Sequence, residues 1–171
     1  KQTIEKASNE QVTAIIGKQA QDPANNWLII QWRNELIRRE DWQGVASWQA
    51  LYPSDALSTR CALLMASNAA NRNDQWQKQV ASIWQSESKL AKPCILAVDA
   101  LNTMTPLTAA QNWQRFDYLL ANDSKEFGEL RERSTGADLA LLNQYIAFIS
   151  SAKAPTEAWP NNERTRTVLT I

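Results

Sequence analysis

The sequence predicts an all-α protein, built as a right-handed superhelix, or solenoid, of antiparallel helical hairpins. Only 4 of the 171 residues are glycine, and residues that favour helices dominate the composition. Few stretches alternate apolar and polar residues, so β-structure has little support. About nine candidate helices, roughly 10 to 16 residues long and joined by turns of roughly 2 to 6, are expected to pair as antiparallel hairpins. A closed bundle is the structural alternative, but this many short helices exceeds what a four-helix bundle packs.

The first three helices follow from caps and breakers near the start of the chain. A capping box at Ser8 begins a helix that we expect to end near Ala20. Residues 21–26 interrupt the helical pattern, and a second helix runs from there to about Arg39. Asp41 is an N-cap for the third helix. The residues expected on the inner faces of the second and third helices are Trp27, Ile30, Leu36 and Ile37, then Trp42, Val45, Trp48 and Leu51.

Acidic caps and a proline mark the next three helices. We expect Asp55 to cap the fourth helix and Asp74 to cap the fifth. Pro93 suits the first turn of the sixth helix. The expected inward-facing residues are Leu57, Cys61, Leu64 and Met65, then Trp76, Val80, Ile83 and Trp84, and finally Cys94, Ile95, Val98 and Leu101.

Three further helices complete the expected stack. Thr105 and Pro106 repeat a cap-then-proline signal and should open the seventh. The eighth is expected over about residues 123–133, and the ninth after Gly136. The apolar residues expected on these helices are Trp113, Phe116, Tyr118, Leu119 and Leu120, then Phe127 and Leu130, and finally Leu139, Leu142, Tyr145, Ile146 and Ile149.

Charge and hydropathy exclude several classes of partner. Lys plus Arg equal Asp plus Glu at 18 each, without a basic stripe, which argues against a nucleic-acid partner. No apolar run approaches the roughly 18 residues of a membrane span. The chain opens without an initiator Met or a signal core, so we interpret it as an excised or processed segment. Residues 1–151 are expected to form the solenoid, and residues 152–171 an extended tail or the start of another helix.

The residue types needed for most catalytic sites are missing. Histidine is absent, which removes histidine-based nucleophile activation and histidine-ligated metals. No Gly-rich phosphate loop occurs, so we expect no catalytic residue, no metal and no cofactor. A glycosidase carboxylate pair remains conceivable by residue type alone. The four candidates, each also explained as a helix cap or a solvated surface charge, are Glu35, Glu40, Asp41 and Asp74.

Cysteine and tryptophan are open to two interpretations each. Cys61 and Cys94 are expected in neighbouring layers of the stack, as two small buried thiols or as a disulfide. A disulfide would place the chain in an oxidising compartment such as the periplasm. The eight tryptophans are mainly expected in the core. The alternative role for a tryptophan is an aromatic platform for sugars.

Five short segments, in order, resemble the long N-terminal helical domain of soluble lytic murein transglycosylases. The resemblance covers about residues 20–150. The segments are residues 32–45 (WRNELIRREDWQGV), 60–64 (RCALL), 81–84 (ASIW, preceded by Trp76), 92–94 (KPC) and 107–116, which ends in WQRF.

This resemblance implies a non-catalytic superhelical scaffold of a periplasmic, Gram-negative enzyme, a carbohydrate lyase. The enzyme's separate lysozyme-like domain would cut peptidoglycan between N-acetylmuramic acid and N-acetylglucosamine, leaving 1,6-anhydro ends. The implied partners are that catalytic domain, on the same polypeptide, and glycan strands, for which Trp159 is a candidate contact. The family's cysteines at these places are bridged, so the resemblance also implies a Cys61–Cys94 disulfide.

Two departures from the family limit what is carried over. The spacing between Pro93 and Cys94 is compressed, and the catalytic domain is absent from these 171 residues. The pair Glu87-Ser88 matches the dipeptide that opens the family's catalytic motif, but a polar turn follows it, so we assign it no catalytic role. The alternative to an enzyme scaffold is a free-standing helical-repeat adaptor, similar to tetratricopeptide proteins, that binds a protein or peptide. An independent hydrolase is the least favoured interpretation.

Overall fold

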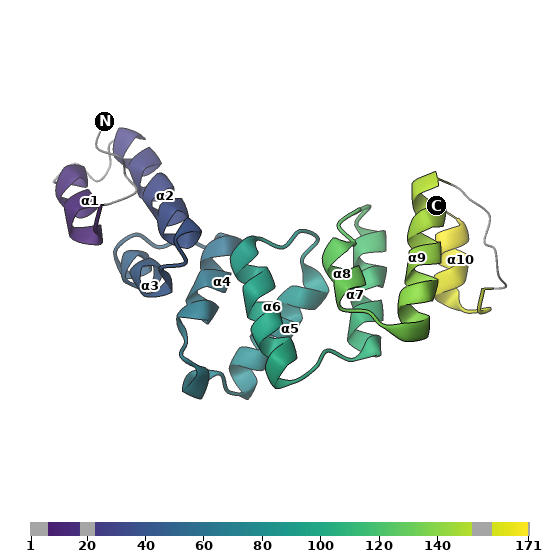
Figure 1. Ribbon diagram of the computed structural model, residues 1–171. Coiled ribbons are helices and arrows are strands. Elements are labelled where there is room, and N and C mark those ends of the chain that lie inside the picture. Colours follow the sequence, from purple (N-terminus) through teal and green to yellow (C-terminus); the bar gives the residue numbers. More distant parts are fainter. Residues whose placement is uncertain (1–6, 18–22, 152–158, 171) are drawn as a thin grey trace. The chain divides into compact units, whose positions relative to one another are not determined.

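The computed structural model describes residues 7–17, 23–151 and 159–170, and in this part the chain is entirely helical (Figure 1). The described residues form ten α-helices and one short 3-10 helix, with no strand among them. The all-α prediction is therefore confirmed for this part of the chain. The elements are α1 (Asn9–Ile16), α2 (Pro23–Arg38), α3 (Trp42–Leu51), α4 (Leu57–Ala66), η2 (Ala69–Asn71), α5 (Asp74–Ser86), α6 (Lys92–Met104), α7 (Ala109–Ala121), α8 (Gly128–Glu132), α9 (Gly136–Ser151) and α10 (Glu163–Leu169).

The chain divides into two compact units. Unit 1 comprises residues 1–81 and 91–100, and unit 2 comprises residues 82–90 and 101–171. Helices α5 and α6 each contribute residues to both units. Each unit is described by itself.

In unit 1, α1 begins as the sequence predicts and ends earlier. The Ser8 hydroxyl accepts the backbone N–H of Gln11, and the Gln11 side chain accepts the N–H of Ser8, which completes the capping box. The helix ends at Ile16, because Gly17 takes the left-handed φ of +56° that a residue with a Cβ rarely adopts. The expected end near Ala20 is therefore wrong, and Ala20 itself lies outside the described residues.

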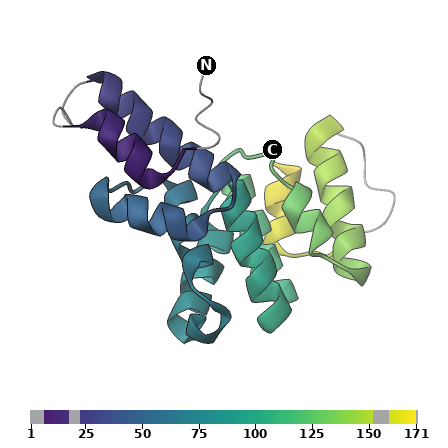
Figure 2. The ribbon, with the colours of Figure 1, turned by 60° about the vertical axis from the view of Figure 1, so that its left-hand side comes forward.

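Helix α2 buries only part of the face that was expected: Leu36 is buried and Ile37 packs against the core, as predicted. Trp32 and Leu36 are buried, as is Ile29 at 8% exposure, whereas Trp27 is 63% exposed and Ile30 is 46% exposed. Apolar residues occur almost all round this helix, so periodicity alone did not select the buried face. The views in Figures 1 and 2 both place α1 alongside α2.

Two tryptophans from neighbouring helices form the centre of unit 1. The rings of Trp32 and Trp48 meet edge to face at 6.5 Å between centroids, and both are fully buried. Trp48 Nε1 also donates to the Ile29 carbonyl at 3.2 Å. Leu51 was expected to share this face and is instead 58% exposed. The buried cluster comprises Val12, Ile16, Ile29, Trp32, Leu36, Val45, Trp48 and Ala62.

The expected caps of α4 and α5 are corrected by the structure, while Asp41 does cap α3. Helix α4 begins after Ala56, which makes no side-chain cap bond, so Asp55 is not its cap. At α5 the cap is Asn73, whose Oδ1 accepts the N–H of Trp76 at 3.1 Å. Asp74 is instead the first helical residue. Asparagine caps as well as aspartate, so either residue satisfied the sequence pattern.

Unit 2 shows two further shifts of helix ends. Helix α7 begins with a capping box at Thr108, not at the Thr105 and Pro106 pair. Helix α8 covers Gly128–Glu132 and is shorter than the expected 123–133. Asp123 has a left-handed φ of +51°, which ends the preceding helix α7 and is incompatible with the start of another α-helix at that residue. In the C-terminal segment, α10 forms with Asn162 as its cap.

The core of unit 2 is aromatic. Phe116 is fully buried, and its ring lies 5.7 Å from that of Tyr145, 5.7 Å from Phe127 and 5.6 Å from Trp113. The Tyr145 hydroxyl is hydrogen-bonded to Thr165 Oγ1 at 2.5 Å, which ties α10 to α9. Figures 1 and 2 both show these two helices side by side.

Candidate functional site

The two cysteines lie together in unit 1. Cys61 on α4 and Cys94 on α6 are fully buried, with their sulfur atoms 2.10 Å apart and their Cα atoms 4.9 Å apart. These distances are those of a disulfide. The structure thus brings together the pair that the family resemblance implies, at a place closed to solvent.

Trp159 packs against the aromatic core of unit 2. Its ring meets Tyr145 edge to face at 4.8 Å and Phe148 at 5.5 Å, and its Nε1 donates to Gln144 Oε1 at 2.7 Å. The side chain is half-buried. A sugar would therefore meet only the part of the ring that these contacts leave exposed.

The candidate carboxylates serve local structure. Glu40 pairs with Lys92 at 2.6 Å, and Asp41 Oδ1 accepts the N–H of Gly44 at 2.8 Å as the cap of α3. Asp74 is exposed in the first turn of α5, where a negative charge favours the helix. These contacts explain each group without a catalytic role.

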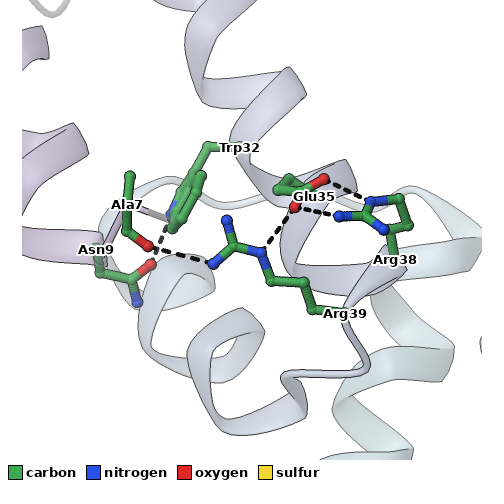
Figure 3. Close-up of polar contacts among 6 residues, drawn as sticks. All are labelled: Ala7, Asn9, Trp32, Glu35, Arg38 and Arg39. Carbon is green, nitrogen blue, oxygen red and sulfur yellow. Dashed lines mark hydrogen bonds and ion pairs between the residues drawn. The ribbon is translucent and has the colours of Figure 1, made fainter. Parts of the chain in front are cut away.

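Glu35 is the centre of a polar network that joins α1 to the end of α2 (Figure 3). Its carboxylate accepts two hydrogen bonds from Arg38, both at 2.7 Å, and one from Arg39 Nε at 2.7 Å. The hydrogen bond from Arg38 is the largest cause that lowers the pKa of Glu35 from 4.5 to about 2, and Arg39 adds to it against the opposing effect of burial. Glu35 is therefore held as a carboxylate near neutral pH and is unsuited to act as a general acid.

The same network extends to the start of α1. Arg39 donates to the Ala7 carbonyl at 3.2 Å and lies over the Trp32 ring at 4.8 Å. Trp32 Nε1 donates to Asn9 Oδ1 at 2.6 Å (Figure 3). These contacts hold the start of α1 against the end of α2, so the cluster has a structural role.

A small polar cavity lies within unit 2, between α7, α8 and the start of α9, and the sequence did not indicate it. Its volume is about 80 Å³. At its wall Trp113 Nε1 donates to Asp138 Oδ1 at 2.7 Å. We call this space the α7–α9 cavity, and it is lined by Leu107, Ala109, Asn112, Trp113, Leu130, Arg133, Ser134, Thr135, Asp138 and Leu142.

Asn112 and Arg133 are two of the polar residues that line the cavity. Asn112 is 7% exposed, and its Nδ2 donates to the Arg133 carbonyl at 2.9 Å. Its Oδ1 is buried without a hydrogen-bond partner among the described residues. Arg133 pairs with Glu129 at 2.5 Å. Trp113 and Asp138, which form a hydrogen bond here, are 25 residues apart in the sequence. No local sequence pattern predicts such a contact, so the site is seen only in the folded structure.

Arg115 is a fully buried cation near the end of α5. Its Nη1 donates to the carbonyl oxygens of Trp84 and Glu87, the latter at 3.0 Å, and its guanidinium lies 4.3 Å from the centre of the Trp84 ring. Burial first, and then the charge of Arg133, lower the pKa of Arg115 to about 10. The group caps carbonyls that the end of α5 leaves open.

Within the described ranges, no group of three or more His, Cys, Asp or Glu residues is arranged to hold a metal ion. No helix in that part is both long and apolar enough to cross a membrane. Comparison of the chain with protein-family models, curated proteins and solved structures found no match.

Proposed function

We propose that this chain is a non-catalytic helical scaffold of a periplasmic lytic transglycosylase that acts on peptidoglycan. In the parent enzyme, a separate domain would cleave the glycan and form the 1,6-anhydro ends. The present segment would form part of the frame around that domain and limit which strands reach it. Its partners would be the catalytic domain of the same polypeptide and glycan strands, with Trp159 as a candidate contact.

The cysteine pair is the observation that carries the proposal. The sequence resemblance implies a bridge between the segments RCALL and KPC. In the structure these segments lie on α4 and α6 with the two sulfur atoms at bonding distance. A buried disulfide fits an oxidising compartment such as the periplasm, because the cytosol keeps thiols reduced.

A right-handed superhelix of hairpins is part of the same proposal. Within unit 1, α2 contacts α3 and α3 contacts α4; within unit 2, α7 contacts α8, α8 contacts α9, and α9 contacts α10. Contacts between consecutive short helices are what stacked hairpins require. A scaffold role without catalysis is supported by the carboxylates of Glu35, Glu40 and Asp41, which form ion pairs or a helix cap.

The test is an activity assay on murein sacculi. We expect the purified 171-residue chain to fold, by circular dichroism, and to release no anhydromuropeptides. The protein extended by the sequence that follows Ile171 in its gene should release them. Release by the 171-residue chain alone, or an extended protein without any lytic activity, would contradict the proposal.

Thiol titration of the denatured protein, purified without reductant, tests the compartment. We expect no free thiol before reduction and two after it. Two free thiols before reduction would remove the observation that carries the proposal.

The second candidate is a helical-repeat adaptor for a protein or peptide. It is favoured by Trp27 and Ile30, large apolar residues that α2 leaves exposed. The gene downstream of Ile171 separates the two candidates. An open frame that continues into Glu-Ser and Gly-x-Met-Gln motifs supports the scaffold, whereas an early stop codon supports the adaptor.

A further inference from the structure

We propose that the α7–α9 cavity binds a small neutral group with an N–H donor and a methyl, namely the acetamido group of a larger ligand. The inference goes beyond the scaffold role and does not rest on it. Four properties of the cavity carry it: its size, its mixed walls, its open acceptor and its charge.

The size of the cavity admits a substituent and excludes a whole sugar or peptide. A volume of about 80 Å³ corresponds to two or three water molecules at about 30 Å³ each. Complete ligand pockets measure roughly 300 to 1,000 Å³. The rest of the ligand would therefore lie outside.

The walls combine apolar and polar surface. Leu107, Leu130 and Leu142 supply aliphatic surface, on which a methyl group loses its contact with water. Thr135 and Asp138 supply polar atoms in the same lining. A purely apolar guest would leave these polar atoms without water or a partner, which costs free energy.

Asp138 offers the acceptor. Its Oδ1 accepts from Trp113 Nε1 at 2.7 Å, which fixes the carboxylate, while its Oδ2 makes no hydrogen bond within the residues that the structure describes. An amide N–H is a suitable donor to that oxygen. Asn112 Oδ1, buried and without a partner in the described part of the chain, is a second acceptor in the same wall.

The charges select a neutral guest. An anion would be repelled by the carboxylate of Asp138. A cation would be attracted by Asp138 but opposed by the Arg133 guanidinium and by the positive end of α9, whose first turn contains Asp138. An anion would meet the opposite combination, so neither sign of charge is favoured over a neutral guest. The carbonyl of an acetamido group has a donor available in the hydroxyl of Thr135, which completes its hydrogen bonding.

The proposal is tested with N-methylacetamide as the probe, titrated into the ¹⁵N-labelled 171-residue chain. The readout is the indole N–H cross-peak of Trp113, assigned with the variant W113F. We expect a saturable shift of this cross-peak, with the other indole cross-peaks nearly unmoved. Acetate and methylammonium should bind at least fivefold more weakly. Equal shifts of all indole cross-peaks, or tighter binding of either ion, would overturn the proposal.

Three variants link the signal to the cavity. D138N keeps an acceptor for Trp113 but replaces the open acceptor Oδ2 with an amide NH2 group, which only donates, so binding should weaken at least fivefold. A109L adds bulk at an exposed residue of the lining and should abolish binding, whereas A110L, at the neighbouring exposed position outside the lining, should leave it unchanged. Thermal melts establish that all three fold, and unchanged binding in D138N or A109L would overturn the proposal.

Two larger probes identify the source of the group. N-acetylglucosamine binding more tightly than N-acetylalanine methylamide would indicate an acetylated sugar, and the reverse order an acylated peptide. Either order supports the acetamido site. Glucose, which lacks the group, binding as well as both would overturn it. The sacculus assay is independent, so the two proposals fail separately.

Discussion

Arginine guanidinium groups lie over tryptophan rings throughout the described part of the chain. A guanidinium is planar and weakly hydrated, so it stacks on an indole while its N–H groups bond elsewhere, which an ammonium does less well. This pairing explains how a chain rich in tryptophan also buries arginine. The pairs are Arg39 with Trp32, Arg72 with Trp76, Arg115 and Arg133 with Trp84, and Arg164 with Trp113.

Among these pairs, we expect the loss of Arg115 over Trp84 to lower the free energy of unfolding the most. R115A would remove the donor that Arg115 supplies to the carbonyl oxygens of Trp84 and Glu87 and open a void beside Trp84, at a cost of about 3 to 5 kcal/mol. R115K retains the positive charge but loses the planar guanidinium that bonds the carbonyl oxygens and stacks on the Trp84 ring, at a cost of about 1 to 3 kcal/mol. Urea unfolding, followed by tryptophan fluorescence, measures both.

The matched control is R131A, because Arg131 is exposed on α8. It should change the free energy of unfolding by less than about 0.5 kcal/mol. An R115K variant as stable as the wild type would show that the charge alone, and not the guanidinium geometry, supports this site.

Glu35 gives stability a defined dependence on pH. Its pKa is about 2 in the folded chain and near 4.5 when unfolded, so the folded state binds its proton less readily. The resulting stability is complete above about pH 4.5 and is lost as the pH falls toward 2. We expect a loss on the order of 1 to 3 kcal/mol, since solvent near the exposed Arg38 screens part of the interaction.

E35Q should lose a similar amount at pH 7 and flatten this part of the pH profile. Urea unfolding at several pH values between 2 and 7 measures both effects. E132Q, at an exposed position of α8, is the control and should retain the wild-type profile. A profile for E35Q that matches the wild type would contradict the assignment to Glu35.

At the scale of the helices, two ends are formed by residues other than glycine. After α2, the N–H of Asp41 bonds to Leu36 O and that of Glu40 to Ile37 O, with Glu40 at φ +59°. After α7, the N–H of Ser124 bonds to Leu119 O, with Asp123 at φ +51°. Both are Schellman motifs in which glycine is the usual left-handed residue.

D123G should therefore stabilise the chain. Glycine adopts the left-handed conformation without the Cβ clash, and the exposed Asp123 side chain makes no hydrogen bond within the described residues. The gain should be about 0.5 to 1 kcal/mol, net of the greater freedom of glycine in the unfolded chain. Thermal or urea unfolding measures it.

The neighbouring variant N122G is the matched control. Asn122 has φ −109° and donates from Nδ2 to Tyr118 O at 2.8 Å, so glycine there should destabilise the chain by about 1 kcal/mol. If both variants changed stability in the same direction, strain at Asp123 would not be the cause.

These helix ends also show what sequence can predict here. The capping boxes are local patterns, and the one at Ser8 was predicted correctly because Ser8 and Gln11 suffice for it. The left-handed turn at Asp123 has no glycine to announce it, so α8 was predicted too long. The buried face of α2 depends on which neighbour covers it, so Leu36 and Ile37 were predicted correctly whereas Trp27 and Ile30 were not. The α7–α9 cavity depends on contacts between residues distant in sequence, so it could not be predicted.

At the scale of the whole molecule, the cysteine pair acts on the unfolded chain as well as on the folded one. A bond between Cys61 and Cys94 closes a loop with a sequence separation of 33 residues, which spans the region from α4 to α6. Such a loop restricts the unfolded ensemble by an entropy equivalent to about 3 to 4 kcal/mol in the chain-entropy model. The free energy of unfolding of native proteins is only about 5 to 15 kcal/mol, so the disulfide would contribute a large fraction of it.

The double variant C61S/C94S should therefore lower the free energy of unfolding by about 3 to 4 kcal/mol, because its unfolded chain is less restricted. Urea unfolding with and without reductant measures this. Reductant should destabilise the wild type by a similar amount and leave the double variant unchanged, which separates loss of the bond from the effect of the serine side chains. A wild-type midpoint that does not respond to reductant after the thiols are shown to be reduced would contradict the prediction.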